Sequence, residues 1–486
     1  MRLRLIAPAT AALAISFATA PAGGQTPRDI VARGVAAMGG EAALRGAAVV
    51  TLDFNTATFG LGQEETPHSP ARATFQTGRV ITDWAGNRRS LTQEVRPLTG
   101  GVQRQRRVTA GGIGMLETDG RPAPDAAGAV AGVERAMRLS PERLLLSAAS
   151  TPTALSAAPP KQLRTAPSDG VRYALGPDTL DLYFDRTSGL LLSVEQVTDD
   201  PILGDRRTAT WYTRWQDAGG IKLPRQVDVE WNGRPQGHTV YTAAATGGTP
   251  DAGAFAIPDS IAARAPKSSS AVPPVAVAVA QVAPGVWHLT GGSHHSLVVE
   301  QSAGLIVVEG PFSTARTRAV LDTLKVRFPA KPVQLVIATH HHWDHTSGLR
   351  GYLAAGVPVM IHNRNTGFVE QVAAAQKTVA PDQLSRGARA PQIRGIGDSL
   401  TVGEGNGRIV LYGLPTVHVE GMLMAYVPSA KVLFNSDLFG PPQQMARASA
   451  LELKAAVRAR NITVDWVAGG HGGPPVRWGE VEKAAQ

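Results

Sequence analysis

The chain has no cysteine among its 486 residues, which excludes disulfides and thiolate metal ligands. Aromatic residues are few, at 5%. Charged residues make up 18% of the chain and hydrophobic residues 43%, which is typical of a globular protein and not of a disordered one. The length predicts two or three domains and is ample for burying sizeable cores.

The sequence also lacks an apolar stretch of membrane-span length without breaking residues, so we expect no transmembrane segment. The apolar run at residues 5–17 is too short to span a membrane comfortably. It follows Arg2 and Arg4 and precedes the cleavage-type tripeptide Ala18-Thr19-Ala20, which together predict a secretory signal peptide at residues 1–20. A buried N-terminal helix is the alternative. We therefore expect the mature protein to be periplasmic or secreted, and without a lipid anchor because no cysteine follows the cleavage site.

Acidic residues are outnumbered by basic ones, giving a net charge of +9 and an isoelectric point near 10.0. Such a balance can indicate a protein that binds nucleic acid or an anionic surface. The Lys and Arg residues are scattered, however, and form neither a basic helix nor an aromatic-interleaved RNA-binding motif. We therefore expect a small-molecule substrate and no nucleic acid. The sequence does not predict the oligomeric state.

Histidine is scarce in the first half of the chain, where only His68 and His238 precede His288. This half predicts a mostly antiparallel β-rich domain at residues 26–245, and it contains no catalytic constellation. Helical patterns occur at residues 29–45, with a break at Gly39-Gly40, and at 133–146, with a break at Ser140-Pro141. Strands are predicted at residues 49–54, 73–83, 180–184, 190–197, 208–215 and 227–231, with a hairpin turn at 185–189.

Residues 246–280 have the composition of a linker, with Gly247-Gly248, a run of three serines and Pro273-Pro274. Residues 275–282 also suit a first strand of the second domain, which we place at 281–486. In that domain, Ser313 is a candidate helix cap. The expected strands lie at 286–289, 297–300, 305–309, 333–339, 357–361, 408–412, 423–427, 432–434 and 464–468, with a further helix at 451–460. This order suits two sheets sandwiched between helices.

The apolar run that begins at Val333 ends at Thr339 and is followed by four histidines and one aspartate. The resulting pattern is His340-x-His342-x-Asp344-His345. Imidazole and carboxylate groups are the ligands that Zn²⁺ takes in catalytic sites. A tight turn at the mouth of a buried strand can direct several of them to one place. A solvated histidine-rich loop is the alternative.

Three more candidate ligands follow predicted strands, namely His418, Asp437 and His471. Each alone is a weak signal, because a histidine after a strand is usually a loop residue and an aspartate there is usually a cap or turn residue. Their order and their common placement after strands favour one shared metal site.

The histidine loop, His418, Asp437 and His471, in this order, resemble four of the five motifs of the metallo-β-lactamase-fold hydrolases. Glu309 is a candidate for the fifth motif, an acidic residue that ends an early strand. The resemblance covers residues 281 to about 486. It implies an α+β protein whose C-terminal domain is an αβ/βα four-layer sandwich, preceded by the antiparallel β-rich domain. The runs at 339–350 and 420–426 look like those of an exported subgroup of this superfamily.

The resemblance also implies a ligand set and a reaction. His340, His342 and His418 would bind one metal ion, Asp344, His345 and His471 a second, and Asp437 both. His341 and Trp343, which alternate with the ligands, should point away. The cofactors would be two divalent ions, expected to be zinc, and a metal-bound hydroxide would cleave an ester, lactone, thioester or related bond. Asp344 would be catalytic, orienting the hydroxide and passing a proton to the leaving group.

One departure from the family narrows the choice of substrate. True β-lactamases of this fold have Cys or Ser where this chain has Asp437, whereas an Asp there resembles the thioesterase, lactonase and phosphodiesterase branches. A periplasmic binding protein with a structural metal and a mononuclear iron oxygenase of the same fold are the alternatives.

In the first half, the runs at 185–191 and 220–224 loosely resemble lipoprotein-carrier-type half-barrels. That resemblance implies a concave sheet that holds an apolar ligand or a partner. A structural accessory domain is the alternative. Loops at 291–296 and 439–446 are expected to form pocket walls of the C-terminal domain.

Overall fold

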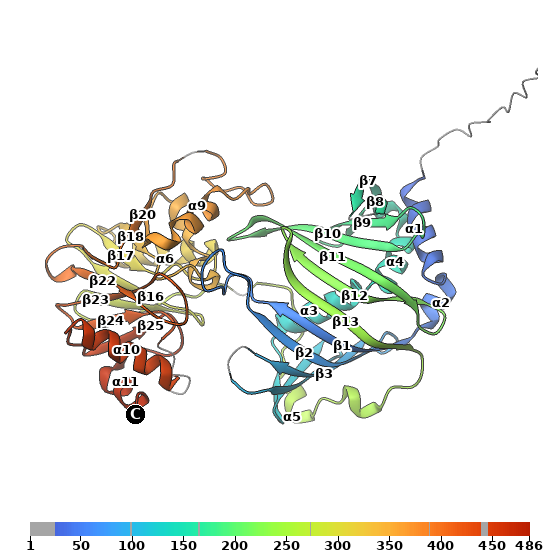
Figure 1. The fold of residues 1–486 in the computed structure, drawn as a ribbon, viewed down its shortest axis with the longest axis horizontal. Helices are drawn as coiled ribbons and strands as arrows, with labels where there is room; N and C mark the ends of the chain where they lie inside the picture. Colours follow the sequence, from blue (N-terminus) through green and yellow to red (C-terminus); the bar gives the residue numbers. More distant parts are fainter. Residues whose placement is uncertain (1–24, 98–99, 164–165, 273, 388, 439–445) are drawn as a thin grey trace, which may run out of the picture.

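The computed structural model describes residues 25–97, 100–163, 166–272, 274–387, 389–438 and 446–486, and these form two lobes (Figure 1). The expected signal peptide at residues 1–20 lies outside the described residues. Among the helices in the described ranges, none has both the length and the apolar character needed to cross a membrane.

A single antiparallel sheet dominates the N-terminal lobe, with strand order β6-β5-β4-β3-β2-β1-β13-β12-β11-β10-β9-β8-β7. Its strands are β1 (Val49–Phe59), β2 (Ala73–Asp83), β3 (Arg88–Arg96), β4 (Gln103–Ala110), β5 (Ile113–Thr118), β6 (Arg121–Pro124), β7 (Leu155–Leu163), β8 (Ala166–Leu175), β9 (Asp178–Asp185), β10 (Leu191–Asp200), β11 (Gly204–Asp217), β12 (Lys222–Trp231) and β13 (Arg234–Thr246). The predicted mostly antiparallel β-rich domain is thus confirmed. All six predicted strands are present, but β3 to β8 and β13 were not predicted.

This sheet is accompanied by the helices α1 (Pro27–Ala37), α2 (Glu41–Gly46), α3 (Ala127–Arg138) and α4 (Pro141–Ser150). The predicted breaks at Gly39-Gly40 and at Ser140-Pro141 are confirmed, since each separates two helices. Helices α1, α2 and α4 bury apolar side chains against strands β8 to β11, with Leu44, Leu145 and Phe184 fully buried. This packing is the hydrophobic core of the lobe.

The C-terminal lobe contains two sheets. The first has the order β14 (Ala278–Ala283), β15 (Val286–Thr290), β16 (Ser296–Glu300), β17 (Leu305–Val308), β18 (Val333–Ile337), β19 (Val359–His362) and β20 (Ile393–Ile396). The second has the order β21 (Ser399–Val402), β22 (Ile409–Leu414), β23 (Met422–Val427), β24 (Val432–Asn435), β25 (Trp466–Gly469) and β26 (Val476–Arg477).

Helices cover the outer faces of both sheets. Helices α6 (Thr314–Arg327), α8 (Leu349–Ala354) and α9 (Thr366–Ala374) pack on the first sheet, and α10 (Arg447–Ala459) and α11 (Trp478–Ala484) pack on the second. Between the sheets, side chains such as Val308, Ile337 and Phe434 form one buried cluster. The predicted four-layer sandwich is confirmed. Ser313 caps α6 as expected, its side chain accepting a hydrogen bond from the Arg316 amide.

Part of the segment expected as a linker packs on the N-terminal lobe. A 3₁₀ helix (Ala252–Phe255) and α5 (Asp259–Ala262) bury Phe255 and Ile261 against Val108 and Met115. Strand β14 begins within the same segment.

The lobes also touch at two places far from this segment. The turn between β10 and β11 inserts Ile202 into the core under the first C-terminal sheet, and Asp205 accepts a hydrogen bond from the Thr378 amide at 2.8 Å. The loop between β1 and β2, residues 60–72, reaches from the N-terminal lobe to the histidine loop (Figure 1).

Candidate metal centre

Every predicted ligand lies just beyond the carboxyl end of a strand in the C-terminal lobe. The histidine loop leaves β18 and leads into the short helix α7 (Trp343–Thr346). His418 follows β22, Asp437 follows β24, and His471 follows β25. Strand β18 pairs in parallel with β17, and β24 in parallel with β25, so the ends of these strands meet at common edges.

The first group of side chains consists of His340, His342, His418 and Asp437, whose ligand atoms all lie within 4.8 Å of one another. The Asp437 Oδ2 atom lies 3.1 Å from His340 Nε2 and 2.6 Å from His418 Nε2. His342 turns its Nδ1 atom inward, 3.1 Å from His418 Nε2. Three imidazoles and one carboxylate thus converge on one point.

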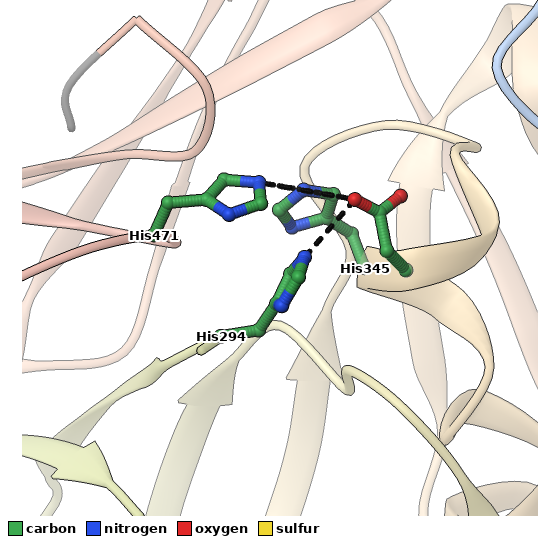
Figure 2. Close-up of side chains that lie close together, drawn as sticks. His294, His345 and His471 are labelled. Carbon is green, nitrogen blue, oxygen red and sulfur yellow. Dashed lines mark hydrogen bonds and ion pairs between the residues drawn. The ribbon is translucent and has the colours of Figure 1, made fainter. Parts of the chain in front are cut away.

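The second group consists of Asp344, His345, His471 and His294, again with all ligand atoms within 4.8 Å of one another. His345 Nε2 and His471 Nε2 are 3.0 Å apart, and His294 Nε2 lies 3.0 Å from Asp344 Oδ2. Figure 2 shows His294, His345 and His471 facing one another from three different segments.

Asp437 joins the two groups. Its Oδ1 atom lies 2.9 Å from both His345 Nε2 and His471 Nε2, while Oδ2 faces the first group. The structure therefore brings together all seven side chains that the sequence selected, and it places Asp437 between the two sets.

The donor set fits cations, because the protein binds the outer ring nitrogens of His340, His342 and His345 by hydrogen bonds while their inner nitrogens face the other ligands. His342 Nε2 donates to the Glu64 carbonyl at 2.9 Å, His345 Nδ1 donates to Glu309 at 2.8 Å, and His340 Nδ1 lies 3.0 Å from the Thr339 hydroxyl. An outer hydrogen bond of this kind orients a metal-ligating imidazole and fixes its tautomer. The inner nitrogens are then left with lone pairs for a metal ion.

The electrostatics of most of these groups also suit metal binding. Burial, together with the neighbouring His340 and His418, lowers the pKa of His342 to about 2. For Asp437, burial opposes ionisation, but His345 and His340 outweigh it and hold the pKa well below its usual range. Neutral imidazoles and ionised carboxylates are the forms that bind metal ions.

His345 behaves differently in the metal-free chain. Burial lowers its pKa, but the carboxylates of Glu309 and Asp437 outweigh burial and raise the pKa well above its usual value. A metal ion at this position therefore competes with a proton for His345 Nε2.

Glu309, the predicted acidic residue of an early strand, lies behind the ligands and not among them. It follows β17 with a positive φ of 74° and is fully buried. Besides His345, it accepts hydrogen bonds from the hydroxyls of Thr339 and Ser436, both at 2.5 Å. Its carboxylate therefore ties the histidine loop to the end of β24.

His341 and Trp343 offer no atom to either group. His341 is buried, with its ring edge-on to Phe368 at 5.9 Å between centroids. The Trp343 ring packs against Gly62 of the N-terminal lobe.

Two residues at the centre were not predicted. His294 was expected only as part of a pocket-wall turn, although the His294-His295 pair directly before a predicted strand is a usable signal. Gln63, whose Nε2 atom donates to Asp344 Oδ1 at 2.7 Å, lies in the other lobe. Most of the second expected pocket wall, residues 439–445, lies outside the described residues.

The C-terminal part of the chain matches a known protein family. Residues 289–476 match the family model of the metallo-beta-lactamase superfamily. A curated relative, the 2,4-dinitroanisole O-demethylase subunit alpha of Nocardioides sp. (strain JS1661), is 26% identical over 153 residues, and this match spans 31% of the present chain and 43% of the relative.

The solved structures that this chain matches include a metallo-beta-lactamase from Pontibacter korlensis, with 17% identity and a TM-score of 0.35 over 43% of this chain and 97% of that one. A metallo beta lactamase from Hirschia baltica has 17% identity and a TM-score of 0.34 over 43% and 96% of the two chains. The histidine and aspartate groups, set in a domain that matches this family, support a metallo-hydrolase type of function. Residues 289–476 of this chain are a domain of the metallo-β-lactamase superfamily.

Proposed function

We propose that this chain is an exported hydrolase that holds two zinc ions and cleaves an ester, lactone, thioester or related bond. The observation that carries the proposal is the position of Asp437, whose two carboxylate oxygens face two separate groups of metal-type donors. A structural zinc site is closed by four ligands and has no need of a second set that shares a carboxylate.

The residues divide the work as follows. His340, His342 and His418 would hold one ion, Asp344, His345 and His471 would hold the other, and Asp437 would serve both. Two divalent cations supply a Lewis acid and make water available as a nucleophile near neutral pH. Asp344 Oδ2 faces the second group, where it orients the attacking water, takes its proton and passes that proton to the leaving atom.

Exposure indicates the side from which a substrate approaches. The side chains of His340, His342 and His345 are at most 1% exposed, whereas those of Asp344, His418 and His471 are 30–33% exposed. A substrate therefore reaches the centre on the side of the latter three residues. The buried histidine loop forms the floor of the site.

A second candidate reaction is cleavage of a methyl aryl ether. The curated relative is named as an O-demethylase subunit for 2,4-dinitroanisole, and it shares 26% identity over 153 residues with this chain. Activated aryl ethers therefore belong in the substrate panel beside the esters and thioesters.

Elemental analysis and a substrate panel test the proposal on the purified full chain. We expect two zinc ions per chain and hydrolysis of at least one lactone, aryl ester, thioester, phosphodiester or aryl methyl ether. Activity should disappear on chelation and return with zinc. A single iron ion per chain together with oxygen consumption would favour an oxygenase. Two tightly held ions without turnover of any of these substrates would favour a binding protein.

Export is a separate part of the proposal and rests on the pattern of residues 1–20. N-terminal sequencing of the protein from its native host should begin just beyond Ala20. An intact Met1 on the periplasmic or secreted protein would contradict cleavage.

A further inference from the structure

We propose that the N-terminal lobe contributes to the metal centre by positioning two of its ligands, because segment 62–64 contacts Asp344 and His342. This inference rests on the proposed function, since it concerns residues that hold the ions. Gln63 and the Glu64 carbonyl are positioning groups and touch no reacting atom.

Gln63 determines which oxygen of Asp344 faces the ions. The Gln63 amide donates to Oδ1 at 2.7 Å, while Oδ2 lies 3.0 Å from His294 Nε2 and 3.5 Å from His345 Nε2. With Oδ1 held from outside, the carboxylate is prevented from rotating, and Oδ2 stays directed at the second group. A carboxylate that binds a metal through one oxygen is commonly fixed in this way through the other.

The Glu64 carbonyl performs the same task for His342. It accepts the Nε2 proton at 2.9 Å across 278 positions of sequence, so Nδ1 is the nitrogen left free to face His418 and Asp437. The Gly62 carbonyl also accepts a hydrogen bond, at 3.1 Å, from the amide of Trp343, which lies between His342 and Asp344. One short segment of the other lobe thus holds the histidine loop at three successive residues.

The N-terminal lobe itself fixes this segment. The Glu64 side chain is 3% exposed, forms an ion pair with Arg234 at the start of β13, and accepts the Gly62 amide at 2.7 Å. Gly62 has a φ of 85°, and a Cβ atom there would lie 2.2 Å from the Trp343 ring. Only glycine fits this close approach between the lobes.

The same loop also supports the other side of the first group. Arg72 Nη2 donates to the His418 carbonyl at 3.2 Å, and the Glu420 amide donates to the Glu65 carbonyl at 2.9 Å. The loop therefore contacts segments that carry ligands of both ions. Separation of the lobes would release both segments at once.

Four full-length variants test the inference. Gln63→Ala removes the donor to Asp344, and Gln63→Glu keeps the shape but places an acceptor beside the carboxylate. Gly62→Ala forces the segment away from Trp343. Gly60→Ala is the matched control, because its added methyl would meet its nearest atoms at 3.6 and 3.7 Å and its φ is not positive.

The readouts are zinc affinity by chelator competition, the absorption spectrum of the cobalt-substituted protein, and kcat separately from KM. We expect Gln63→Ala to weaken the second ion about 10–100-fold, to alter the cobalt spectrum and to lower kcat more than KM. Gln63→Glu should lower zinc affinity and kcat at least as much as Gln63→Ala does. Loss of packing alone does not explain such a result, because glutamate has nearly the same shape as glutamine. Gly62→Ala should lower the affinity for both ions, and Gly60→Ala should match the wild type in all three readouts.

Failure of this inference is distinguishable from failure of the proposed function. If the wild type holds two ions and turns over substrate, yet the Gln63 and Gly62 variants all match Gly60→Ala, the positioning role is overturned and the hydrolase stands. If the wild type holds no ions, the positioning role and the proposed hydrolase function are both overturned.

Discussion

Glu309 Oε2 accepts a hydrogen bond from His345 Nδ1 at 2.8 Å, and neither side chain is exposed to solvent. Such a buried carboxylate raises the basicity of the imidazole and fixes its ring, so the other nitrogen is presented to a metal ion. Because Glu309 also holds Thr339 and Ser436, it connects the two strand ends that carry most of the ligands.

We therefore predict that Glu309→Gln lowers metal affinity about 10–100-fold while the chain still folds, since the amide has nearly the same shape. Metal content after dialysis against a graded chelator measures the effect. Glu300→Gln is the control, because Glu300 pairs with Lys331 away from the centre and its side chain is 23% exposed. Equal affinity in the two variants would show that the Glu309 charge plays no part in metal binding.

His294 offers the second group a third imidazole. We predict that His294→Ala weakens the second ion and leaves the first unchanged. The loss could arise because His294 binds the ion or because it orients Asp344. His294→Asn can still donate to Asp344, so full recovery of affinity in this variant would mean that His294 only orients the carboxylate. The control is His238→Ala in the N-terminal lobe, where the side chain is 47% exposed and pairs with Asp228. Titration of metal-free protein with zinc measures both affinities.

The sequence predicted the elements whose alternation is clear. In β9 the apolar residues Leu180, Leu182 and Phe184 are all at most 1% exposed, so the period of two is visible in the chain. Strand β4 was missed because it begins Gln-Arg-Gln-Arg-Arg and buries few of its side chains deeply. Its pairing with β3 and β5 overrides a weak local preference.

The candidate site likewise contains residues that the sequence predicts and residues that it does not. The seven predicted side chains lie in short local motifs at strand ends, and such motifs can be recognised from the sequence alone. Gln63 and His294 lie 281 and 50 positions from the carboxylate they contact. Gln63 stands in no ligand-type pattern, and the only signal for His294 is the His294-His295 pair before a predicted strand. A backbone carbonyl such as that of Glu64 carries no side-chain signature, so contacts of this kind emerge only from the folded chain.

Acid stability of the C-terminal domain should depend on Asp382. This carboxylate pairs in bidentate fashion with the buried Arg350, at 2.6 and 3.1 Å. Burial would raise the pKa of Asp382, but the Arg350 and Ser385 hydrogen bonds outweigh it and lower the pKa to about 2. The pair therefore stabilises the fold fully above about pH 4, the range of an unfolded aspartate, and the contribution is lost as the pH falls to about 2.

Asp382→Asn should accordingly lower the free energy of unfolding by about 3–5 kcal/mol at neutral pH, because Arg350 remains buried without its partner. Urea unfolding at a series of pH values checks this. The difference from the wild type should shrink by about 2 kcal/mol between pH 4 and pH 2. A difference that stays constant over this range would contradict the assigned role.

Asp437→Asn should damage the centre more than the fold. The carboxylate supplies negative charge to both groups, and its two oxygens lie 2.6–3.1 Å from four imidazole nitrogens. An amide has nearly the same shape but no charge, so the variant should fold, hold the pair of ions less well and lose orders of magnitude in kcat. If Asp437 were only a turn residue, the change would cost at most about 0.5–2 kcal/mol of stability and leave turnover intact. Metal content and the rate of hydrolysis, measured on the same preparation, decide between these outcomes. If Asp437→Asn held two ions and kept near wild-type turnover, Asp437 would not be the shared ligand, and the proposed two-ion centre would lose its main support.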